Sequence, residues 1–197
     1  MGNIANAKAI TFLDTETICI DPVKGVNTLL SVCFITDWDD GNSSTVSLKI
    51  KLSLNQKEHA SAEALKINNY SKEAWADAIS IEEAAPVIAK SIAWGPIVAH
   101  NAQFDVNHIV SSLEACGWRK TKRGERFSIE NKTFQVGYPV IDTCNLAYLF
   151  MDSERQNLPA LREALDLDPE RAHDALTDTE DCRYLFYHIM KTSLNSL

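Results

Sequence analysis

Three groups of polar residues, far apart along the chain, carry side chains that could do chemistry. The first is Asp14 with Glu16 two positions later, at the end of an apolar run that reads as a β-strand. Side chains at i and i+2 of a strand point to the same face, so the two carboxylates lie side by side. The two carboxylates repel each other unless a cation neutralises them. A hard, oxygen-binding ion such as Mg²⁺ or Mn²⁺ is the natural occupant of such a site. Alone, such a pair more often marks a solvated strand end.

The second group runs from His100 to Asp105, where a short predicted strand at 97–99 gives way to a helix. Open α/β sheets bind ligands beyond the carboxyl ends of their strands, so polar residues at this point favour a site. Each residue also has a simpler interpretation. Asp105 fits a carboxylate in the first turn of a helix, and His100 and Asn101 fit turn residues with local hydrogen bonds.

The third group, His173 to Asp178, stands at the head of the last predicted helix. His173 and Asp178 are five positions apart and therefore do not share a helical face, so the histidine is expected on the loop before the helix. Its pKa near neutrality suits it to accept a proton from an attacking water. A lone histidine here would more simply be a hydrogen-bonded helix-start residue. Asp174 and Asp181 are expected to be capping or solvated residues.

Taken together and in this order, the three groups resemble the exonuclease motifs of the DnaQ-like DEDD superfamily. The matching patterns are Asp14-Thr-Glu16, His100-Asn-x-x-Phe104-Asp105 and His173-x-Ala175-x-x-Asp178. The histidine five residues before the last aspartate is similar to that of the DEDDh branch. All three patterns in the right order, over Ile10 to Met190, would be improbable by chance.

The resemblance implies an α/β protein of RNase H-like fold, with a five-stranded mixed sheet flanked by helices. It implies a two-metal site, with Mg²⁺ or Mn²⁺ ions roughly 3.5–4 Å apart. The implied metal ligands are Asp14, Glu16, Asp105 and Asp178, with Asp14 as the bridging ligand. These four and His173, as the general base, form the implied catalytic set, and the product would be nucleoside 5′-monophosphates.

The resemblance also indicates residues for holding the last nucleotide of the substrate. They are Thr15, Thr17, His100, Asn101 and Phe104. Phe104 fits two uses equally well, because aromatic rings stack on bases but are also common in protein cores.

The remaining sequence indicates the elements that position these residues. Apolar, β-favouring runs at 9–14, 29–35 and 46–52 predict a three-stranded meander. Ser80 and Glu83 form a capping box for a helix that Gly95 and Pro96 end, with Pro86 indicating a kink or a later start. Further helices are expected at 104–116, from 143, at 158–165 and at 175–190.

We expect a single exonuclease domain over residues 1–197, with its core at about 8–191 and a basic insertion at 118–138. Five basic residues crowd into eight positions of the insertion, where they could contact a phosphate backbone or form a solvated loop. They are Arg119, Lys120, Lys122, Arg123 and Arg126. A hairpin is expected there between Phe127–Ile129 and Thr133–Val136.

Composition and charge limit the class of protein. An apolar fraction of 45% without any run near 20 apolar residues predicts no membrane span, and the N-terminus shows no secretory signal, so a cytoplasmic protein is expected. The five scattered cysteines lack a CxxC pair, which favours reduced thiols over a zinc cluster or disulfides. The net charge of −8 opposes nucleic-acid binding unless divalent cations occupy the acidic site.

The function that we predict is a free-standing, metal-dependent 3′–5′ exonuclease acting on single-stranded DNA or RNA ends. One alternative is a proofreading subunit that is active only beside a DNA polymerase, and another is a binding module without catalysis. The sequence does not decide whether the substrate is DNA or RNA, or whether it is single- or double-stranded. It also does not decide whether the protein is a homodimer.

Overall fold

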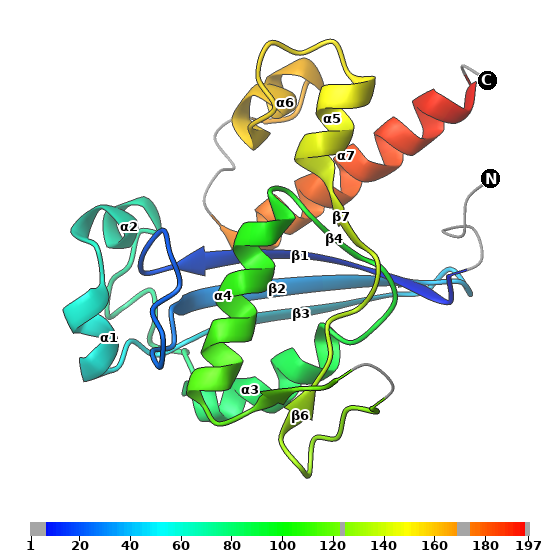
Figure 1. Cartoon of the computed structure of the whole chain (residues 1–197). Helices are drawn as coiled ribbons and strands as arrows, with labels where there is room; N and C mark the ends of the chain where they lie inside the picture. Colours follow the sequence, from blue (N-terminus) through cyan, green and yellow to red (C-terminus); the bar gives the residue numbers. More distant parts are fainter. Residues whose placement is uncertain (1–6, 123–124, 169–173, 196–197) are drawn as a thin grey trace.

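A five-stranded mixed sheet forms the centre of the molecule in the computed structural model, which describes residues 7–122, 125–168 and 174–195 (Figure 1). The strands are β1 (Ala9–Thr17), β2 (Leu29–Trp38), β3 (Ser43–Lys49), β4 (Ile97–Ala99) and β7 (Val140–Asp142). Their order across the sheet is β3-β2-β1-β4-β7. The first three form an antiparallel meander, and β4 and β7 continue it parallel to β1. The predicted fold class is confirmed.

Helices cover both faces of this sheet. They are α1 (Leu54–His59), α2 (Ala62–Ile67), α3 (Ile81–Ser91), α4 (Ala102–Ala115), α5 (Thr143–Phe150), α6 (Leu158–Ala164) and α7 (Ala175–Asn195). The predicted capping box of Ser80 and Glu83 is present, and α3 starts at Ile81 with Pro86 inside it, so the later start is wrong. The short helices α1 and α2 were not predicted.

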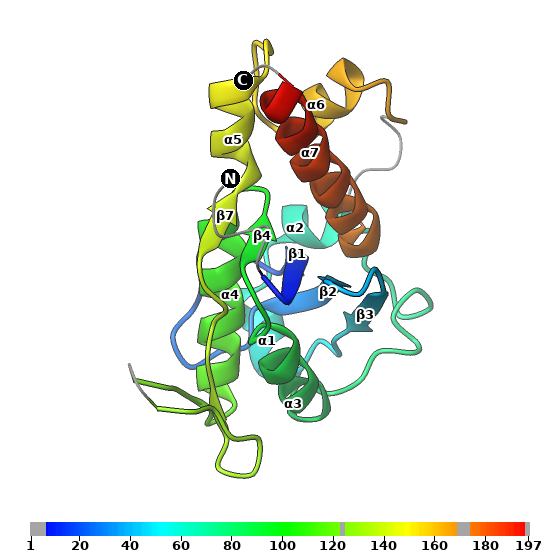
Figure 2. The ribbon, with the colours of Figure 1, turned by 90° about the vertical axis from the view of Figure 1, so that its right-hand side faces the viewer.

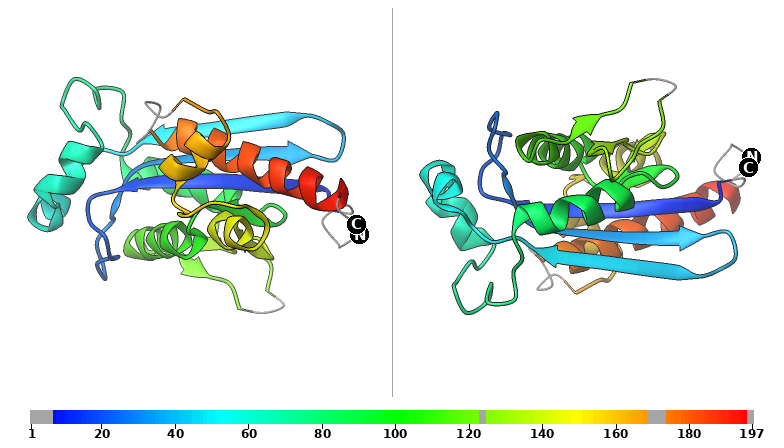
Figure 3. Two further views of the ribbon diagram at one scale, coloured as in Figure 1. Left: turned by 90° about the horizontal axis from the view of Figure 1, so that it is seen from above. Right: turned by 90° about the horizontal axis from the view of Figure 1, so that it is seen from below.

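Alternating side chains of β1 pack into two separate hydrophobic cores, one on each face of the sheet. Leu13 packs with residues of α3 and α4, whereas Phe12 packs with Cys182 and Phe186 of α7. Seen from above, α7 lies over the sheet, and seen from below α3 does (Figure 3). Because strand side chains alternate with a period of two, Asp14 and Glu16 share the face of Phe12 and point toward α7.

The helices α5, α6 and α7 lie together at one side of the sheet (Figure 2). A small apolar cluster joins them, in which Leu161 of α6 and Ala147 of α5 pack against Leu185 and Ile189 of α7. This packing fixes α6 against the middle of α7, and Arg162 of α6 reaches Asp178 and Asp181 nearer the start of α7. The position of Asp178 is therefore set by the meeting of these helices as well as by the sheet.

The predicted hairpin in the 118–138 insertion is wrong. Thr133–Phe134 forms a strand, β6, but it pairs in parallel with β5 (Arg119–Lys120) instead of with Phe127–Ile129. Burial explains the choice, since Phe134 is fully buried in the core that contains α3 and α4, and β5 directly follows α4. Residues 129–132 still turn the chain, and Thr133 N–H donates to Ser128 O over 2.9 Å.

The five cysteines are free thiols in the structure, as expected. Among the described residues, no helix has the length and apolar character needed to cross a membrane.

Candidate active site

Three carboxylates from two elements meet near the carboxyl end of β1. Asp14 and Glu16 project from one face of β1 toward the first turn of α7, which carries Asp178. Carboxylate oxygens of the three residues lie within 4.8 Å of one another. All three side chains are half-buried. Oxygen atoms at this spacing form a donor set that suits a hard divalent cation.

Asp105 approaches the same strand from α4, in whose first turn it lies. Its Oδ1 atom accepts hydrogen bonds from the backbone N–H of Thr15, over 2.9 Å, and from the Thr15 hydroxyl, over 2.8 Å. Asp105 therefore contacts β1 at Thr15, the residue between Asp14 and Glu16, and its charge acts on both of these carboxylates. The structure thus gathers the four predicted ligands as a trio and a fourth member that Thr15 holds.

Burial and like charge make this site unfavourable for four ionised carboxylates. Burial raises the pKa of Glu16 to about 8, with further contributions from Asp178 and Asp105. Burial, and then the charge of Asp105, raise the pKa of Asp14 well above its usual range. Burial raises the pKa of Asp105 to about 7, against the effect of its hydrogen bonds from Thr15. A bound cation would relieve this repulsion, so the residues fit a divalent metal.

These shifts predict how stability without metal depends on pH. The folded state retains protons that the unfolded chain releases, so the free energy of unfolding should fall as pH rises from about 4.5, the ordinary value for Glu16, to about 8. Thermal unfolding in chelator should therefore show a lower Tm at pH 8 than at pH 5.5, and Mn²⁺ should remove most of the difference. Glu16→Gln should flatten the profile in chelator, and a Tm that rises with pH over this range would contradict the expectation.

The predicted general base, His173, lies outside the described residues. Its neighbour Asp174 caps α7, because its Oδ2 atom accepts from the backbone N–H of Thr177 over 3.2 Å and from the Thr177 hydroxyl over 3.1 Å. The expected capping role of Asp174 is confirmed.

A buried arginine, Arg162 of α6, contacts the site and was missed by the sequence analysis. Its Nη2 atom donates to Oδ1 of Asp178, and its Nε atom donates to Oδ2 of Asp181 over 2.6 Å. The expectation that Asp181 is solvated or capping is therefore wrong, since its carboxylate is buried and paired. One signal was available, because Arg162 lies four positions after Leu158, on the apolar stripe of α6, where an arginine requires a buried partner.

Two of the predicted substrate-binding residues line a cavity at the N-terminal end of α4, the helix whose first turn carries Asp105. His100 and Asn101 face a hollow of about 630 Å³ that Arg155, Gln156 and Asn157 also line. His100 Nδ1 lies 3.0 Å from the Thr143 hydroxyl. Asn101 has a left-handed backbone, with φ at 64°, and its N–H donates to Asp142 Oδ1 over 3.0 Å. Polar groups with fixed backbone therefore border this hollow.

The other predicted substrate-binding residues already have partners within the protein. The hydroxyl of Thr15 donates to Asp105, and that of Thr17 donates to Cys19 O over 2.8 Å. The ring of Phe104 is half-buried and lies 4.5 Å, between centroids, from the ring of His108. The structure thus gives the two threonines local structural contacts and gives Phe104 a ring contact within its own helix.

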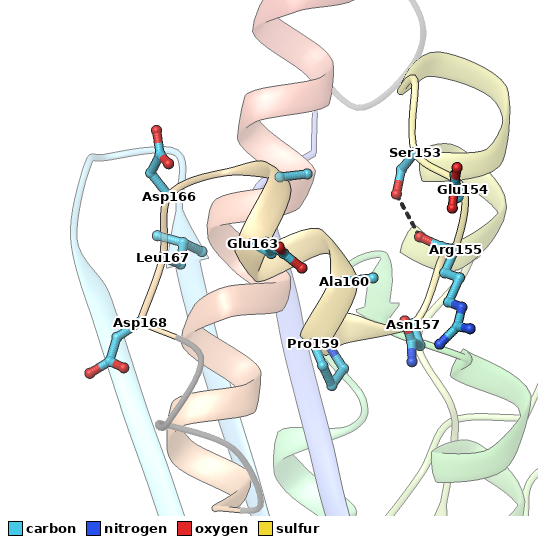
Figure 4. A pocket seen from close by; sticks show the side chains of 11 residues that line it. Ser153, Glu154, Arg155, Asn157, Pro159, Ala160, Glu163, Asp166, Leu167 and Asp168 are labelled. Atoms are coloured by element: carbon cyan, nitrogen blue, oxygen red, sulfur yellow. Dashed lines mark hydrogen bonds between the residues drawn. The ribbon is translucent and has the colours of Figure 1, made fainter.

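A larger cavity, of about 1180 Å³, adjoins this hollow along α6 (Figure 4). Glu154, Arg155 and Asn157 line both spaces. The larger cavity also carries the acidic side chains of Glu163, Asp166 and Asp168, of which Asp166 and Asp168 lie at the end away from Arg155. These charges would repel a phosphate backbone, and among the described residues Arg155 is the one basic side chain that lines the larger cavity.

The basic cluster of the insertion lies away from the carboxylates. Arg119 follows the C-terminal end of α4, whereas Asp105 lies in its first turn, and the helical rise separates the two ends by ~15 Å. Arg119 is also paired with Glu125, at 2.9 Å. Arg123 lies outside the described residues. Among the described residues, Arg119 and Lys120 therefore lie at the opposite end of α4 from the carboxylate site.

Comparison with known proteins gives one matching family and several similar folds. Residues 11–186 match the RNase_T family model, described as exonuclease. Over 138 residues the chain is 27% identical to a DNA polymerase III of PolC type from Bacillus cereus, which covers 70% of this chain but only 9% of that protein.

The solved structures that it resembles are nucleases at low sequence identity, and they show the fold alone. An Exonuclease I from Methylocaldum szegediense matches with a TM-score of 0.64 and 19% identity, over 88% of this chain and 38% of that one. Exonuclease X in complex with 5′ overhanging duplex DNA matches with a TM-score of 0.59 and 20% identity, over 93% and 92%. A zinc-bound complex of E. coli Exonuclease I with single-stranded DNA matches with a TM-score of 0.61 and 14% identity, over 92% and 40%.

Proposed function

The chain belongs to the RNase T/DnaQ-like exonuclease family, and on this premise we propose that it is a metal-dependent 3′–5′ exonuclease. It would hydrolyse the terminal phosphodiester bond of single-stranded DNA or RNA and release nucleoside 5′-monophosphates. The observation that carries the proposal is the meeting of Asp14, Glu16 and Asp178 beside Asp105.

In this proposal the chain's own residues hold two divalent cations, Mg²⁺ or Mn²⁺. Asp14, Glu16 and Asp178 supply oxygens from one side of β1, and Asp105 supplies its carboxylate from the side of α4. When bound, the ions lower the pKa of a coordinated water and stabilise charge on the phosphate and the leaving 3′ oxygen. Thr15 keeps Asp105 in place through its two hydrogen bonds.

We assign proton transfer to His173, which places the protein in the DEDDh branch. The residue stands five positions before Asp178 in the sequence, and an imidazole with a pKa near neutrality can accept the proton of the attacking water. This role rests on the motif, because His173 lies outside the described residues.

Single-stranded ends are the substrate that the cavity at the N-terminal end of α4 favours. It is open and bordered by His100, Asn101 and Arg155, whose polar groups suit a sugar and a phosphate. The structure of E. coli Exonuclease I, which has a similar fold, contains single-stranded DNA. That of Exonuclease X contains duplex DNA with a 5′ overhang. DNA and RNA both remain within the proposal.

A second candidate function, proofreading, is favoured by the similarity to a polymerase. The matched segment is 9% of the PolC-type DNA polymerase III, so this chain resembles a small part of a replicating enzyme. A protein of this kind would act only beside a polymerase, and co-purification with one at a stoichiometric ratio would favour it. The presence of all four carboxylates opposes the third candidate, a binding module without catalysis.

The test is degradation of matched oligonucleotides labelled at the 3′ or the 5′ end, both DNA and RNA, single- and double-stranded. Each is incubated with Mg²⁺, with Mn²⁺ and with chelator. Mononucleotides released from the 3′ end only with metal would support the proposal and identify the substrate. No release from any oligonucleotide would contradict a free-standing nuclease, and release on adding a DNA polymerase would select the proofreading function.

Arg155→Ala should weaken binding of a single-stranded oligonucleotide and reduce its salt dependence. Arg155 is exposed and lines the cavity that also carries His100 and Asn101. Losing one phosphate contact on a single strand lowers the slope of log K against log salt by about 0.7. Fluorescence anisotropy in Ca²⁺ at several salt concentrations would measure it. Arg126→Ala, which removes the same charge from the distant insertion, is the matched control, and equal slopes for all three proteins would exclude the contact.

A further inference from the structure

We propose that Arg162 and Asp181 form a neutral pair that positions the Asp178 carboxylate for metal binding. This inference rests on the proposed function, since Asp178 is one of the ligands assigned there. In it, the guanidinium orients Asp178, while Asp181 cancels the arginine's charge so that the site keeps its attraction for cations.

The contacts that carry the proposal join two helices. Arg162 lies in α6, and its side chain is 1% exposed. Its Nη2 atom donates to Asp178 Oδ1, and its Nε atom donates to Asp181 Oδ2 over 2.6 Å. The two carboxylates are three positions apart on α7 and so lie on the same helical face. One planar guanidinium therefore spans both of them.

The charges explain why a second carboxylate is present. A buried arginine beside a metal ligand would by itself repel an incoming cation and reduce the negative charge of the site. Asp181, whose side chain is 6% exposed, balances it at 2.6 Å. The pair as a whole is neutral, so what it contributes to Asp178 is a directed hydrogen bond, and it adds no net positive charge to the ligand site.

The geometry also explains why the positively charged residue of the pair is an arginine and not a lysine. A guanidinium offers several donors in a fixed plane, whereas a lysine ammonium is a single rotating group on a flexible stem. The stem of Arg162 starts from a helix that the apolar contacts of Leu161 anchor against α7. The donor is therefore fixed before any metal arrives. Partners that orient a metal ligand are worth 10–100-fold in affinity or activity in known metal sites.

The competing interpretation is that the pair only fastens α6 to α7. A purely structural pair would change the free energy of unfolding but not the affinity of the folded protein for metal. Metal binding to the folded chain is thus the measurement that separates the two. It also needs no nuclease activity.

The main experiment compares Mn²⁺ binding by the full chain and by the double variant Arg162→Met/Asp181→Leu. The variant replaces a neutral buried pair with apolar side chains, an exchange that often leaves stability unchanged or improved. Isothermal titration, with electron paramagnetic resonance of free Mn²⁺ as a second readout, should show Kd raised about 10–100-fold. Circular dichroism and thermal unfolding in chelator should stay near the values of the unchanged protein.

A matched control is available on the same helix. Arg183 of α7 pairs with Asp37 of β2 at 2.7 Å. Asp37 lies opposite Ile10, four residues before Asp14 on β1, which places this pair ~13 Å along the strand from the carboxylates. Arg183→Met/Asp37→Leu also removes an ion pair between α7 and its neighbour, and it should leave the Kd for Mn²⁺ unchanged.

Three single substitutions keep the proposal testable if the double variant does not fold. Arg162→Lys retains the charge but not the planar fork, so Mn²⁺ binding should weaken in a folded protein. Asp181→Asn leaves the charge of Arg162 unbalanced beside Asp178 and should also weaken Mn²⁺ binding, whereas Asp181→Glu keeps the balancing charge and should retain most of the affinity. Folded Arg162→Lys and Asp181→Asn proteins that bind Mn²⁺ with unchanged or lower Kd would overturn the proposal.

The outcome is separable from that of the proposed function. If the unchanged protein degrades no oligonucleotide but its Mn²⁺ affinity depends on the pair, the nuclease assignment fails and the positioning role stands. If the protein is an active nuclease whose variants bind Mn²⁺ normally, the positioning role fails alone. In an active enzyme the pair variants should need more Mn²⁺ for half-maximal rate, with much of the rate restored at saturating metal.

Discussion

Replacing Asp14 with asparagine is expected to lower exonuclease turnover by at least ~10³-fold while the protein stays folded. Asp14 is the carboxylate at the centre of the site, since it interacts with Asp105, Asp178 and Glu16 at once. Asparagine keeps the shape but removes the charge, and metal stabilisation of a phosphoryl transition state is worth several kcal/mol. Each 1.36 kcal/mol of barrier is tenfold in rate. Initial rates on a 3′-labelled oligonucleotide at saturating Mn²⁺ would measure the loss.

The same substitution should raise the Tm of the protein in chelator at pH 8. It removes one of the like charges that burial holds close together, so the folded state gains stability as activity disappears. Asp77→Asn is the matched control, because that carboxylate is largely exposed beside Lys49. Turnover near normal in Asp14→Asn would remove Asp14 from the ligand set, and a lower Tm would show that its charge supports the fold.

Much of the site could be predicted because its residues follow directly from local periodicity. A strand at β1 places Asp14 and Glu16 on the same face, because strand side chains alternate. A helix at α7 places Asp178 near its start. Their meeting needed one further fact, that α7 packs on the face of the sheet that carries Phe12. The sequence order of three motifs supplied that fact through the family resemblance, since spacing alone contains no information about which face a helix covers.

The parts that could not be predicted depend on contacts between distant segments. Arg162 and Asp181 are nineteen positions apart. The apolar stripe of α6 indicates that Arg162 needs a buried partner, but no local pattern identifies Asp181 as that partner until α6 is placed against α7. In the insertion, the sequence predicts that Thr133 and Phe134 pair with the nearby segment 127–129. In the structure they pair with β5, because Phe134 is buried in the core beside the end of α4. Local pattern predicts which residues form an element better than it predicts the element's partner.

The substrate-binding residues show the same limit at the scale of single atoms. Thr15 was grouped with the residues that hold the nucleotide, but its hydroxyl and its N–H both donate to Asp105. It thus acts on the site by holding a carboxylate. Arg155, which borders the same cavity as His100, belongs to no motif and became visible only when the loop before α6 was placed.

His173→Ala is expected to reduce kcat about 10²–10⁴-fold, the usual contribution of a general base, without weakening Mn²⁺ binding. The substitution leaves the four carboxylates in place, so metal affinity and chemistry should separate, in contrast to Asp14→Asn, which loses both. Single-turnover rates with Mn²⁺ titration would measure the two effects. Added imidazole should recover part of the lost rate, because a free base of similar pKa can accept the proton from water.

His59→Ala is the matched control, since His59 is exposed on α1. It should keep normal turnover and show no response to imidazole. Activity near normal in His173→Ala would transfer the role of base to another group and would remove the chain from the histidine-dependent branch. Loss of Mn²⁺ binding together with turnover would instead mean that His173 supports the metal site and is not the proton acceptor.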